Sequence, residues 1–345
     1  MTAVAGVRVG VCGLGLIGGS ALLGLREAGV DVRGCDPHPA PRDWCAALGV
    51  PVDADVAATA RAVDVLLVCV PPHATAAVVA AALGEGDDLV VLDAASVKGP
   101  VVDEVRRRVP DAAGRFLPAH PLAGAERAGH AAARADLLRD VPWAVCPPAD
   151  DPEGEADALD ALLRAAPVLG ALRAHLVVCT AADHDRAVAA TSHAPHVVAG
   201  AVGRAATTAP TGGPLAAALS GGSLRDATRV AGAPAGMWLE VLHANAEATA
   251  DALEATAAAL TAVADALRRE DRGAIEDAWR AGGTAHDAIR RRRWTPPAWR
   301  PTTLPATWAA LLALGAEGVA VRDLRPTDDG RLAAERSVTD GAASA

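Results

Sequence analysis

The sequence predicts an α/β protein, with a Rossmann-type N-terminal domain on a mostly parallel sheet and an all-helical C-terminal domain. Three observations predict this class. Short apolar runs alternate with helix-like segments from Val7 to about Val178. A glycine-rich turn follows the first run, and after Cys179 alanine-rich helical spacing replaces the strand pattern.

A chain of 345 residues exceeds the usual size of one compact core, so we expect separate domains. The predicted boundaries enclose a Rossmann-like domain (1–178), a helical domain (179–293) and a proline-rich, partly disordered extension (294–345). The candidate strands are continuously apolar, which is typical of parallel strands covered by helices on both faces. They read VRVGVC, VDVRGC, VDVLLVCV, DLVVLDA, RFLPA, VPWAVC and LRAHLVV. Helices are expected over 180–206, 234–268 and 271–291, and the extension offers a short helix and two edge strands.

Composition excludes several classes of protein. The formal net charge of −10 argues against a nucleic-acid partner, because phosphate binding needs concentrated Lys and Arg. Six scattered cysteines without a C-x-x-C pair indicate a reduced, intracellular protein. No apolar run is long enough to span a bilayer. We therefore expect a cytoplasmic protein with no membrane partner.

The first candidate strand runs into the turn G-L-G-L-I-G, which opens a helix. Glycines at these positions permit a tight turn, close approach of a pyrophosphate and close helix packing, while the helix N-terminus offers N–H groups. Asp36 ends the second strand, where a carboxylate accepts ribose hydroxyls and repels a 2′-phosphate, which favours NAD over NADP. His38, two residues after Asp36, leaves NADP as an alternative coenzyme. A structural glycine turn with a capping aspartate, without any coenzyme, is the other alternative. The predicted cofactor-binding residues are Gly13, Gly15, Leu16, Ile17, Gly18, Asp36 and Val70.

His120 follows the candidate strand RFLPA and has three interpretations: a buried loop residue, a metal ligand or a general base. Ligands of open α/β sheets bind outside the carboxyl ends of the strands, and Ser96 ends the preceding strand. Bound NAD makes hydride transfer the default chemistry, and a neutral imidazole can accept a hydroxyl proton. His193 and His196 have ligand-pair spacing, but no acidic or cysteine ligands accompany them, so no metal is predicted. Asp93 and Lys98 are expected to be loop and helix-start residues.

At these residues the sequence resembles the prephenate and arogenate dehydrogenases of tyrosine biosynthesis. The motifs are GLGLIGGS (13–20), DAASVK (93–98), HPLAGAE (120–126), TSHAPH (191–196) and GGSLRDATRVAGAPAGMW (221–238). The resemblance implies NAD-dependent oxidative decarboxylation of prephenate to 4-hydroxyphenylpyruvate. Arogenate and 4-amino-4-deoxyprephenate are the alternative substrates. It also implies a homodimer formed through the helical domain.

By this resemblance His120 is the catalytic base, and Ser96 is the catalytic serine that hydrogen-bonds this histidine and the substrate hydroxyl. Arg229 pairs with the ring carboxylate. The remaining predicted substrate-binding residues are His196 near the polar end of the side chain, Gly222, Asp226 and Trp238 shaping the pocket, and Glu126 as a gating or hydrogen-bonding acid. The alternative for Trp238 is that the partner subunit supplies this residue to the pocket. Ala125, Leu224 and Leu239 depart from the family pattern and bear on substrate choice.

Two other classes of protein fit these residues less well. A β-hydroxyacid dehydrogenase or imine reductase typically depends on a lysine in its helical domain, and residues 179–268 contain no lysine. A non-catalytic NAD-binding regulator has no need for Ser96, His120, His196 and Arg229 together. The sequence therefore favours the dehydrogenase.

Overall fold

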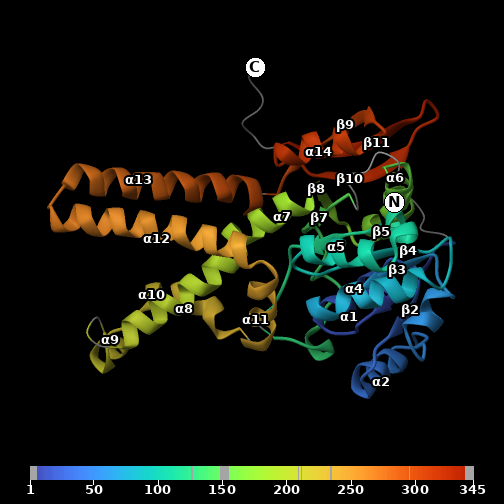
Figure 1. Cartoon of the computed structure of the whole chain (residues 1–345), viewed down its shortest axis with the longest axis horizontal. Coiled ribbons are helices and arrows are strands. Elements are labelled where there is room, and N and C mark those ends of the chain that lie inside the picture. The colour runs from blue at the N-terminus through green and yellow to red at the C-terminus, as the bar shows by residue number, and fades with distance from the viewer. Residues whose placement is uncertain are drawn as a thin grey trace. The chain divides into compact units, whose positions relative to one another are not determined.

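The computed structural model describes residues 6–125, 127–147, 155–208, 210, 212–233, 235–294 and 296–338 (Figure 1). The chain divides into two compact units, one that runs to Asp185 and includes Pro301–Arg336, and one formed mainly by Arg186–Arg300. The first boundary lies a few residues beyond the predicted 178/179. Most of the predicted extension is folded into the first unit.

The first unit contains a parallel five-stranded sheet in the order β2-β1-β3-β4-β5. Alternate residues of its strands enter two different hydrophobic clusters, with Val9 and Val11 in one and Leu66 and Val68 in the other. Both faces are thus buried, which explains the continuous apolar runs. The strands are β1 Arg8–Cys12, β2 Asp31–Cys35, β3 Val65–Val68, β4 Val90–Asp93 and β5 Phe116–Leu117.

Helices cover both faces of this sheet. Buried residues of α1 and α6 belong to one hydrophobic cluster, and those of α4 and α5 belong to the other. The helices are α1 Leu16–Glu27, α2 Pro39–Ala47, α3 Val56–Ala60, α4 Pro72–Leu83, α5 Gly99–Arg108 and α6 Glu155–Ala171. The predicted Rossmann-type layering is confirmed.

A second, six-stranded sheet in the order β6-β7-β8-β10-β11-β9 corrects the expectation that all N-terminal strands share one sheet. The strands are β6 Ala119–Pro121, β7 Pro142–Val145, β8 His175–Val178, β9 Ala298–Pro305, β10 Val321–Pro326 and β11 Arg331–Val338. The chain changes sheets at Pro118, which has no N–H for a ladder, and whose carbonyl accepts from the Cys146 N–H at 2.9 Å. His120 therefore lies on the first strand of the second sheet.

The C-terminal segment is ordered where it is described. β10 pairs with β8, and α14 (Trp308–Ala316) buries Trp308 and Leu311 in the same core as the nucleotide-binding sheet. The short helix and the two strands after it are present, but β10 and β11 lie inside the sheet and not at its edge, and β9 is an additional strand that forms the edge. The tail predicted to be disordered, GAASA, lies outside the described residues.

The second unit is helical, as predicted. Its helices are the end of α7 (Ala181–Val188), α8 Ala194–Thr207, α9 Pro214–Ala218, α10 Gly222–Thr228, α11 Ala235–Ala244, α12 Ala246–Arg268 and α13 Arg272–Ile289. Helices α12 and α13 form an antiparallel hairpin (Figure 1). Between α7 and α8 the backbone forms a π-turn, Ala189–His193, which ends two residues before Pro195, whose missing N–H interrupts the α-helical ladder. Within the described residues, no helix combines the length and apolarity needed to cross a membrane.

Candidate active site

The glycine turn after β1 leaves room for a ligand where the motif predicts one. Gly13 has φ +89°, and a Cβ there would lie 2.6 Å from the Cys69 carbonyl oxygen. A Cβ on Gly18 would lie 1.9 Å from the Gly13 carbonyl oxygen, whereas a Cβ on Gly15 would meet no protein atom within 4 Å. The outer glycines are therefore required by the fold, and the open face at Gly15 and the N-terminus of α1 fit a dinucleotide phosphate. A Cβ on Gly13 would also lie 3.1 Å from Val70 Cγ1, so the Val70 side chain lies beside this glycine.

Asp36 is 9% exposed and is held by the backbone at the same turn. The Leu14 N–H donates to its Oδ2 at 2.7 Å, and the His38 N–H donates to its Oδ1 at 2.9 Å. A carboxylate has about four lone-pair directions, so both oxygens retain capacity to accept ribose hydroxyls. This geometry fits the predicted ribose contact.

A fully buried ion pair supports the strand that carries His120. Lys98 Nζ contacts Asp93 Oδ2, and both side chains are 0% exposed. Lys98 Nζ also donates to the Ala119 carbonyl at 2.7 Å, while Asp93 Oδ1 accepts from the Ala119 N–H at 2.9 Å. Lys98 begins α5 as its N-cap residue, as expected, whereas Asp93 is the last residue of β4 and not a loop residue. A buried carboxylate and a buried ammonium are each costly without a partner of opposite charge. Here both side chains also hydrogen-bond to the backbone of Ala119, the residue before His120.

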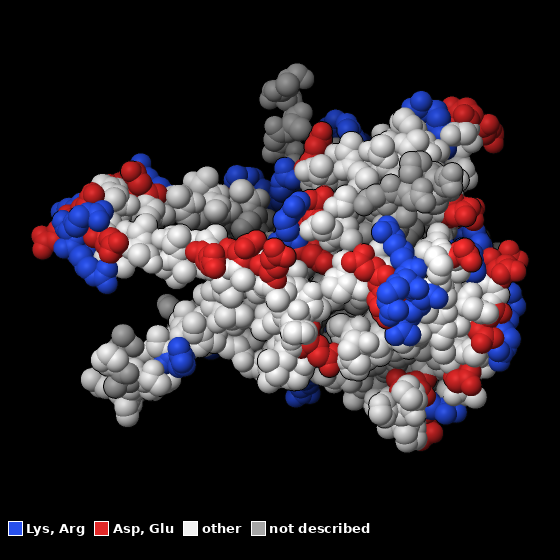
Figure 2. Space-filling view, viewed as in Figure 1, with Lys and Arg blue, Asp and Glu red and all other residues white. Residues whose placement is uncertain are grey.

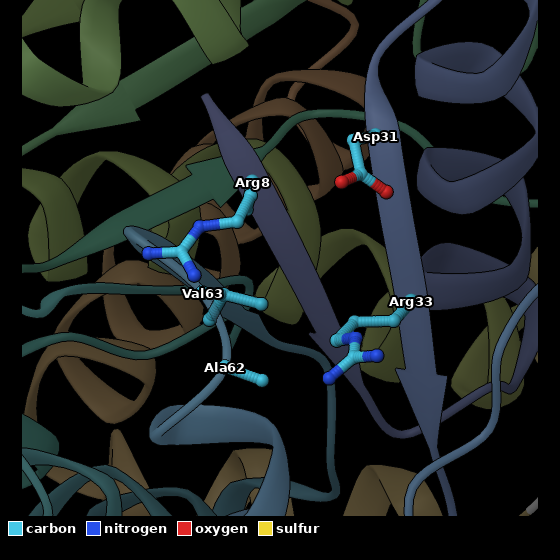
Figure 3. Close-up of a pocket in the computed structure, with 5 residues that line it drawn as sticks. All are labelled: Arg8, Asp31, Arg33, Ala62 and Val63. Carbon is cyan, nitrogen blue, oxygen red and sulfur yellow. The ribbon is translucent and has the colours of Figure 1, made fainter. Parts of the chain in front are cut away.

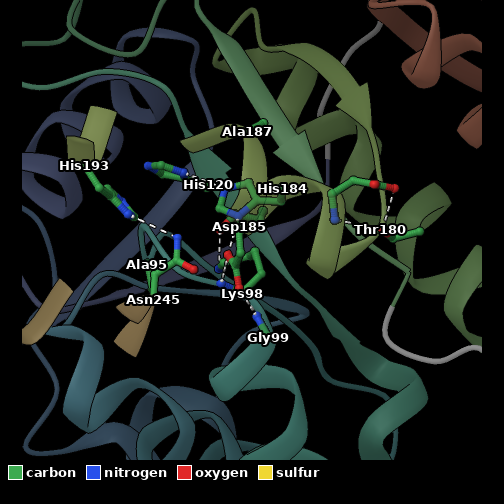
Figure 4. A network of polar contacts seen from close by, with 12 residues as sticks. Ala95, Lys98, Gly99, His120, Thr180, His184, Asp185, Ala187, His193 and Asn245 are labelled. Atoms are coloured by element: carbon green, nitrogen blue, oxygen red, sulfur yellow. Dashed lines mark hydrogen bonds and ion pairs between the residues drawn. The ribbon is translucent and has the colours of Figure 1, made fainter. Parts of the chain in front are cut away.

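His120 is half-buried and contacts a second histidine (Figure 4). His120 Nδ1 lies 2.9 Å from His184 Nε2, and His184 Nδ1 lies 2.8 Å from Asp185 Oδ1. Asp185 in turn accepts from the backbone N–H groups of Lys98 and Gly99, each at 2.8 Å. These contacts link β6, the first turns of α7 and the start of α5. Ser96 is half-buried in the turn between β4 and α5.

Burial and hydrogen bonding set the charges along this network. Burial lowers the pKa of His184, and this outweighs the opposite effect of Asp185. Burial alone would raise the pKa of Asp185, but hydrogen bonds from His184, Lys98 and Gly99 hold it below its usual range. The network therefore ends in an ionised carboxylate beside a neutral imidazole.

In the helical unit, His193, His196 and Trp238 lie together. His196 stacks on the Trp238 indole with ring centroids 3.7 Å apart, and His193 meets the same indole edge-on at 6.0 Å. The Ser192 carbonyl lies 2.8 Å from His196 Nδ1, and the Asn245 amide lies 3.1 Å from His193 Nδ1. Trp238 thus contacts histidines of its own chain.

The GGSLRDATR motif spans an exposed helix. Gly222 begins α10, Asp226 lies 3.2 Å from the Arg225 guanidinium, and Arg229 begins the 3₁₀ turn Arg229–Gly232. Arg229 is exposed. Glu126, the predicted gating acid, lies outside the described residues.

Two surface features lie away from these residues. A pocket of about 300 Å³ is lined by Arg8, Asp31, Arg33, Ala62 and Val63 (Figure 3). It lies at the start of β1 and β2, at the edge of the sheet opposite the glycine turn, so it takes no part in the candidate site. Figure 2 shows charges of both signs mixed on the face in view, including at the turn between α12 and α13.

Comparison with known proteins follows the two units. The model for the prephenate dehydrogenase nucleotide-binding domain matches residues 21–171, and that for the prephenate dehydrogenase dimerization domain matches 180–279. A cyclohexadienyl dehydrogenase of Zymomonas mobilis is 30% identical over 290 residues, which covers 82% of this chain and 96% of that protein. The chain belongs to the prephenate dehydrogenase family.

Other members of the prephenate dehydrogenase family agree with this. The prephenate dehydrogenase of Lactococcus lactis is 26% identical, covering 84% of this chain and 79% of that protein. The crystal structure of the A. aeolicus prephenate dehydrogenase, in complex with hydroxyphenyl propionate and NAD+, has a TM-score of 0.73 at 22% identity. It covers 84% of this chain and 100% of that chain, so the fold is shared. The resemblance read from the motifs is confirmed.

The motif-based prediction for this family member missed His184 and Asp185. A signal for them was present in the sequence, because a His-Asp pair opens a helix directly after the last strand of the N-terminal series. Chemistry-bearing residues at that end of a strand are candidates for a site. Their contact with His120 depends on the change of sheets at Pro118, which apolar periodicity does not reveal.

Proposed function

We propose that this enzyme is an NAD-dependent prephenate dehydrogenase that converts prephenate to 4-hydroxyphenylpyruvate. The observation that carries the proposal is His120, a histidine in the family's HP-x-AG position whose Nδ1 contacts a buried neutral imidazole. Such a partner is suited to a ring that must accept a proton at its other nitrogen. The open face of the glycine turn and the carboxylate of Asp36 support NAD as coenzyme.

The proposed mechanism assigns one task to each group. When bound, NAD would supply the two-electron acceptor for the hydride on the ring carbon that carries the hydroxyl. His120 accepts the hydroxyl proton as the carbonyl forms. The ring carboxylate then leaves as carbon dioxide, its bonding electrons make the ring aromatic, and the proton returns from His120 to the phenol oxygen. Arg229 pairs with the anionic substrate through a planar guanidinium, and Ser96 donates to the substrate oxygen.

A substrate panel tests this function. The purified full chain is assayed with prephenate, arogenate and 4-amino-4-deoxyprephenate, each with NAD and with NADP, by following reduced nicotinamide. We expect the highest kcat/KM with prephenate and NAD. A preference for another of these substrates would reassign the substrate and keep the reaction class, whereas no turnover with any of them would overturn the proposal.

The coenzyme preference gives a separate prediction at Asp36. Replacing Asp36 by serine should narrow the NAD-to-NADP ratio of kcat/KM by about tenfold or more, because a like charge no longer faces the 2′-phosphate. Asp43→Ser is the control, because Asp43 lies on α2, the helix that follows Asp36 in the chain. This substitution should leave the NAD-to-NADP ratio of kcat/KM unchanged. A native preference for NADP would contradict the assignment of Asp36.

We further propose a homodimer formed through the helical unit. All eight of the large hydrophobic residues described as exposed fall within Arg186–Arg300. They are Val202, Leu215, Leu219, Leu239, Leu260, Leu267, Trp279 and Ile289, of which Trp279 is 84% exposed. Apolar surface concentrated in this way marks an interaction face.

Sedimentation equilibrium at micromolar concentration should therefore report a dimer. The double substitution Leu260→Glu/Trp279→Glu should shift it towards monomer, because buried charges are costly in an apolar interface. Arg26→Glu, an exposed position on α1, is the control and should leave the dimer intact. A monomeric native protein at this concentration would contradict the proposal.

A further inference from the structure

The hydrogen-bond network behind His120 determines where its proton lies. Asp185 is the fixed end, because its Oδ1 accepts from the Lys98 N–H and its Oδ2 accepts from the Gly99 N–H. Both donors are backbone groups at the start of α5, and they cannot turn away. An ionised carboxylate only accepts hydrogen bonds. The group that faces it at 2.8 Å, His184 Nδ1, must therefore carry hydrogen.

The state of His184 follows from that of Asp185. His184 is 3% exposed, and its burial keeps the ring neutral. A neutral imidazole has one N–H and one lone pair, so hydrogen on Nδ1 leaves the lone pair on Nε2. In the opposite tautomer, a lone pair would face the carboxylate at hydrogen-bond distance, which is repulsive.

The same reasoning reaches His120. Its Nδ1 lies 2.9 Å from His184 Nε2, the atom that carries the lone pair, and the two rings meet edge-on with an interplanar angle of 75°. A hydrogen bond across this distance requires hydrogen on His120 Nδ1. In the neutral ring the lone pair is then on Nε2.

We propose that His184 and Asp185 are positioning residues that hold His120 as the Nδ1–H tautomer, so that Nε2 is the atom that accepts the substrate's proton. The inference rests on the proposed function for the reaction that His120 serves, although the tautomer itself is independent of any substrate. Once His120 is protonated, its Nδ1–H still donates to His184, so the network accommodates both states of the base. The role parallels that of the aspartate in a Ser-His-Asp triad, with a second imidazole placed between acid and base.

Two substitutions at one position separate positioning from packing. Glutamine at position 184 can place its amide oxygen near the original Nε2 and accept from His120. Asparagine instead reaches only as far as Nδ1 and loses that acceptor. We expect His184→Asn to lower the single-turnover rate of NADH formation about 10- to 100-fold, with KM for both substrates changed less than about twofold. His184→Gln should recover most of the rate.

Nitrogen-15 NMR of the full-length, histidine-labelled protein reads the tautomer directly. The His120 signals, assigned by their loss in His120→Asn, should show hydrogen on Nδ1 and a lone pair on Nε2. In His184→Asn this preference should disappear.

The outcomes separate the two proposals. Native protein that turns over prephenate while His184→Asn keeps the full rate would overturn the positioning role and leave the function standing. Equal losses in His184→Asn and His184→Gln would also overturn it, because they would make His184 a packing residue. An Nε2–H tautomer of His120 in the native protein would overturn it as well. Native protein without activity but with the Nδ1–H tautomer lost in His184→Asn would refute the function and support the network.

Discussion

Replacing His120 by asparagine should lower turnover about 10²–10⁴-fold, while the affinities for NAD and substrate stay close to those of the native enzyme. Asparagine preserves the polarity and approximate size of the side chain, but its amide cannot accept a proton at neutral pH. Steady-state kinetics with coenzyme binding measured separately checks the result. His286→Asn, on exposed α13, is the matched control.

The pH dependence should change with the same substitution. Only a neutral imidazole accepts a proton, so kcat/KM of the native enzyme should rise with pH as His120 loses its proton. In His120→Asn that rise should be absent. Near-native turnover in this variant would make His120 a loop residue and remove the mechanism.

Arg229→Ala should differ in kind from His120→Asn. A guanidinium that pairs with a substrate carboxylate contributes binding energy before and during the reaction, so its loss should appear mainly as a higher KM. Arg225, four residues before the start of the same 3₁₀ turn, pairs with Asp226 and is exposed, so Arg225→Ala is the comparison. Equal kinetics for the two variants would contradict the role of Arg229.

The sequence predicts the layered fold because its signals are local. A continuously apolar strand such as Val65–Val68 needs cover on both faces, and the two hydrophobic clusters supply it. The glycine turn is equally readable, since positive φ at Gly13 and the close approach at Gly18 admit no side chain.

The rest depends on pairings distant in sequence. β5 is only two residues long, and the chain leaves the first sheet at Pro118, so the placement of His120 on a second sheet depends on β7. In the sequence the C-terminal strands have the pattern of polar edge strands. Their place in the sheet depends on the pairing of β10 with β8, and the burial of Trp308 joins the segment to the core. Likewise, Asp185 is a helix-start acid in the sequence, and only the fold brings it to the backbone of Lys98.

Lys98→Met should lower the free energy of unfolding of the nucleotide-binding unit by about 3–5 kcal/mol, because it leaves the carboxylate of Asp93 in a fully buried site without its cation. The Ala119 carbonyl loses a donor in the same change. Denaturant unfolding of the full chain, followed by a probe in this unit, measures the effect. Arg107→Met breaks a pair with Glu104 in which the arginine is 69% exposed, so this control should cost less than about 1 kcal/mol.

A double-mutant cycle identifies the cause of the loss. In Asp93→Asn/Lys98→Met neither charge remains, and the amide oxygen can still accept from the Ala119 N–H. The double variant should therefore be more stable than the sum of the single losses by at least about 1 kcal/mol. A cost for Lys98→Met no larger than that of Arg107→Met would show that the buried pair does not hold this strand. If the cost is large, turnover should fall with it, because the two charges hold Ala119 from both sides and His120 is the next residue.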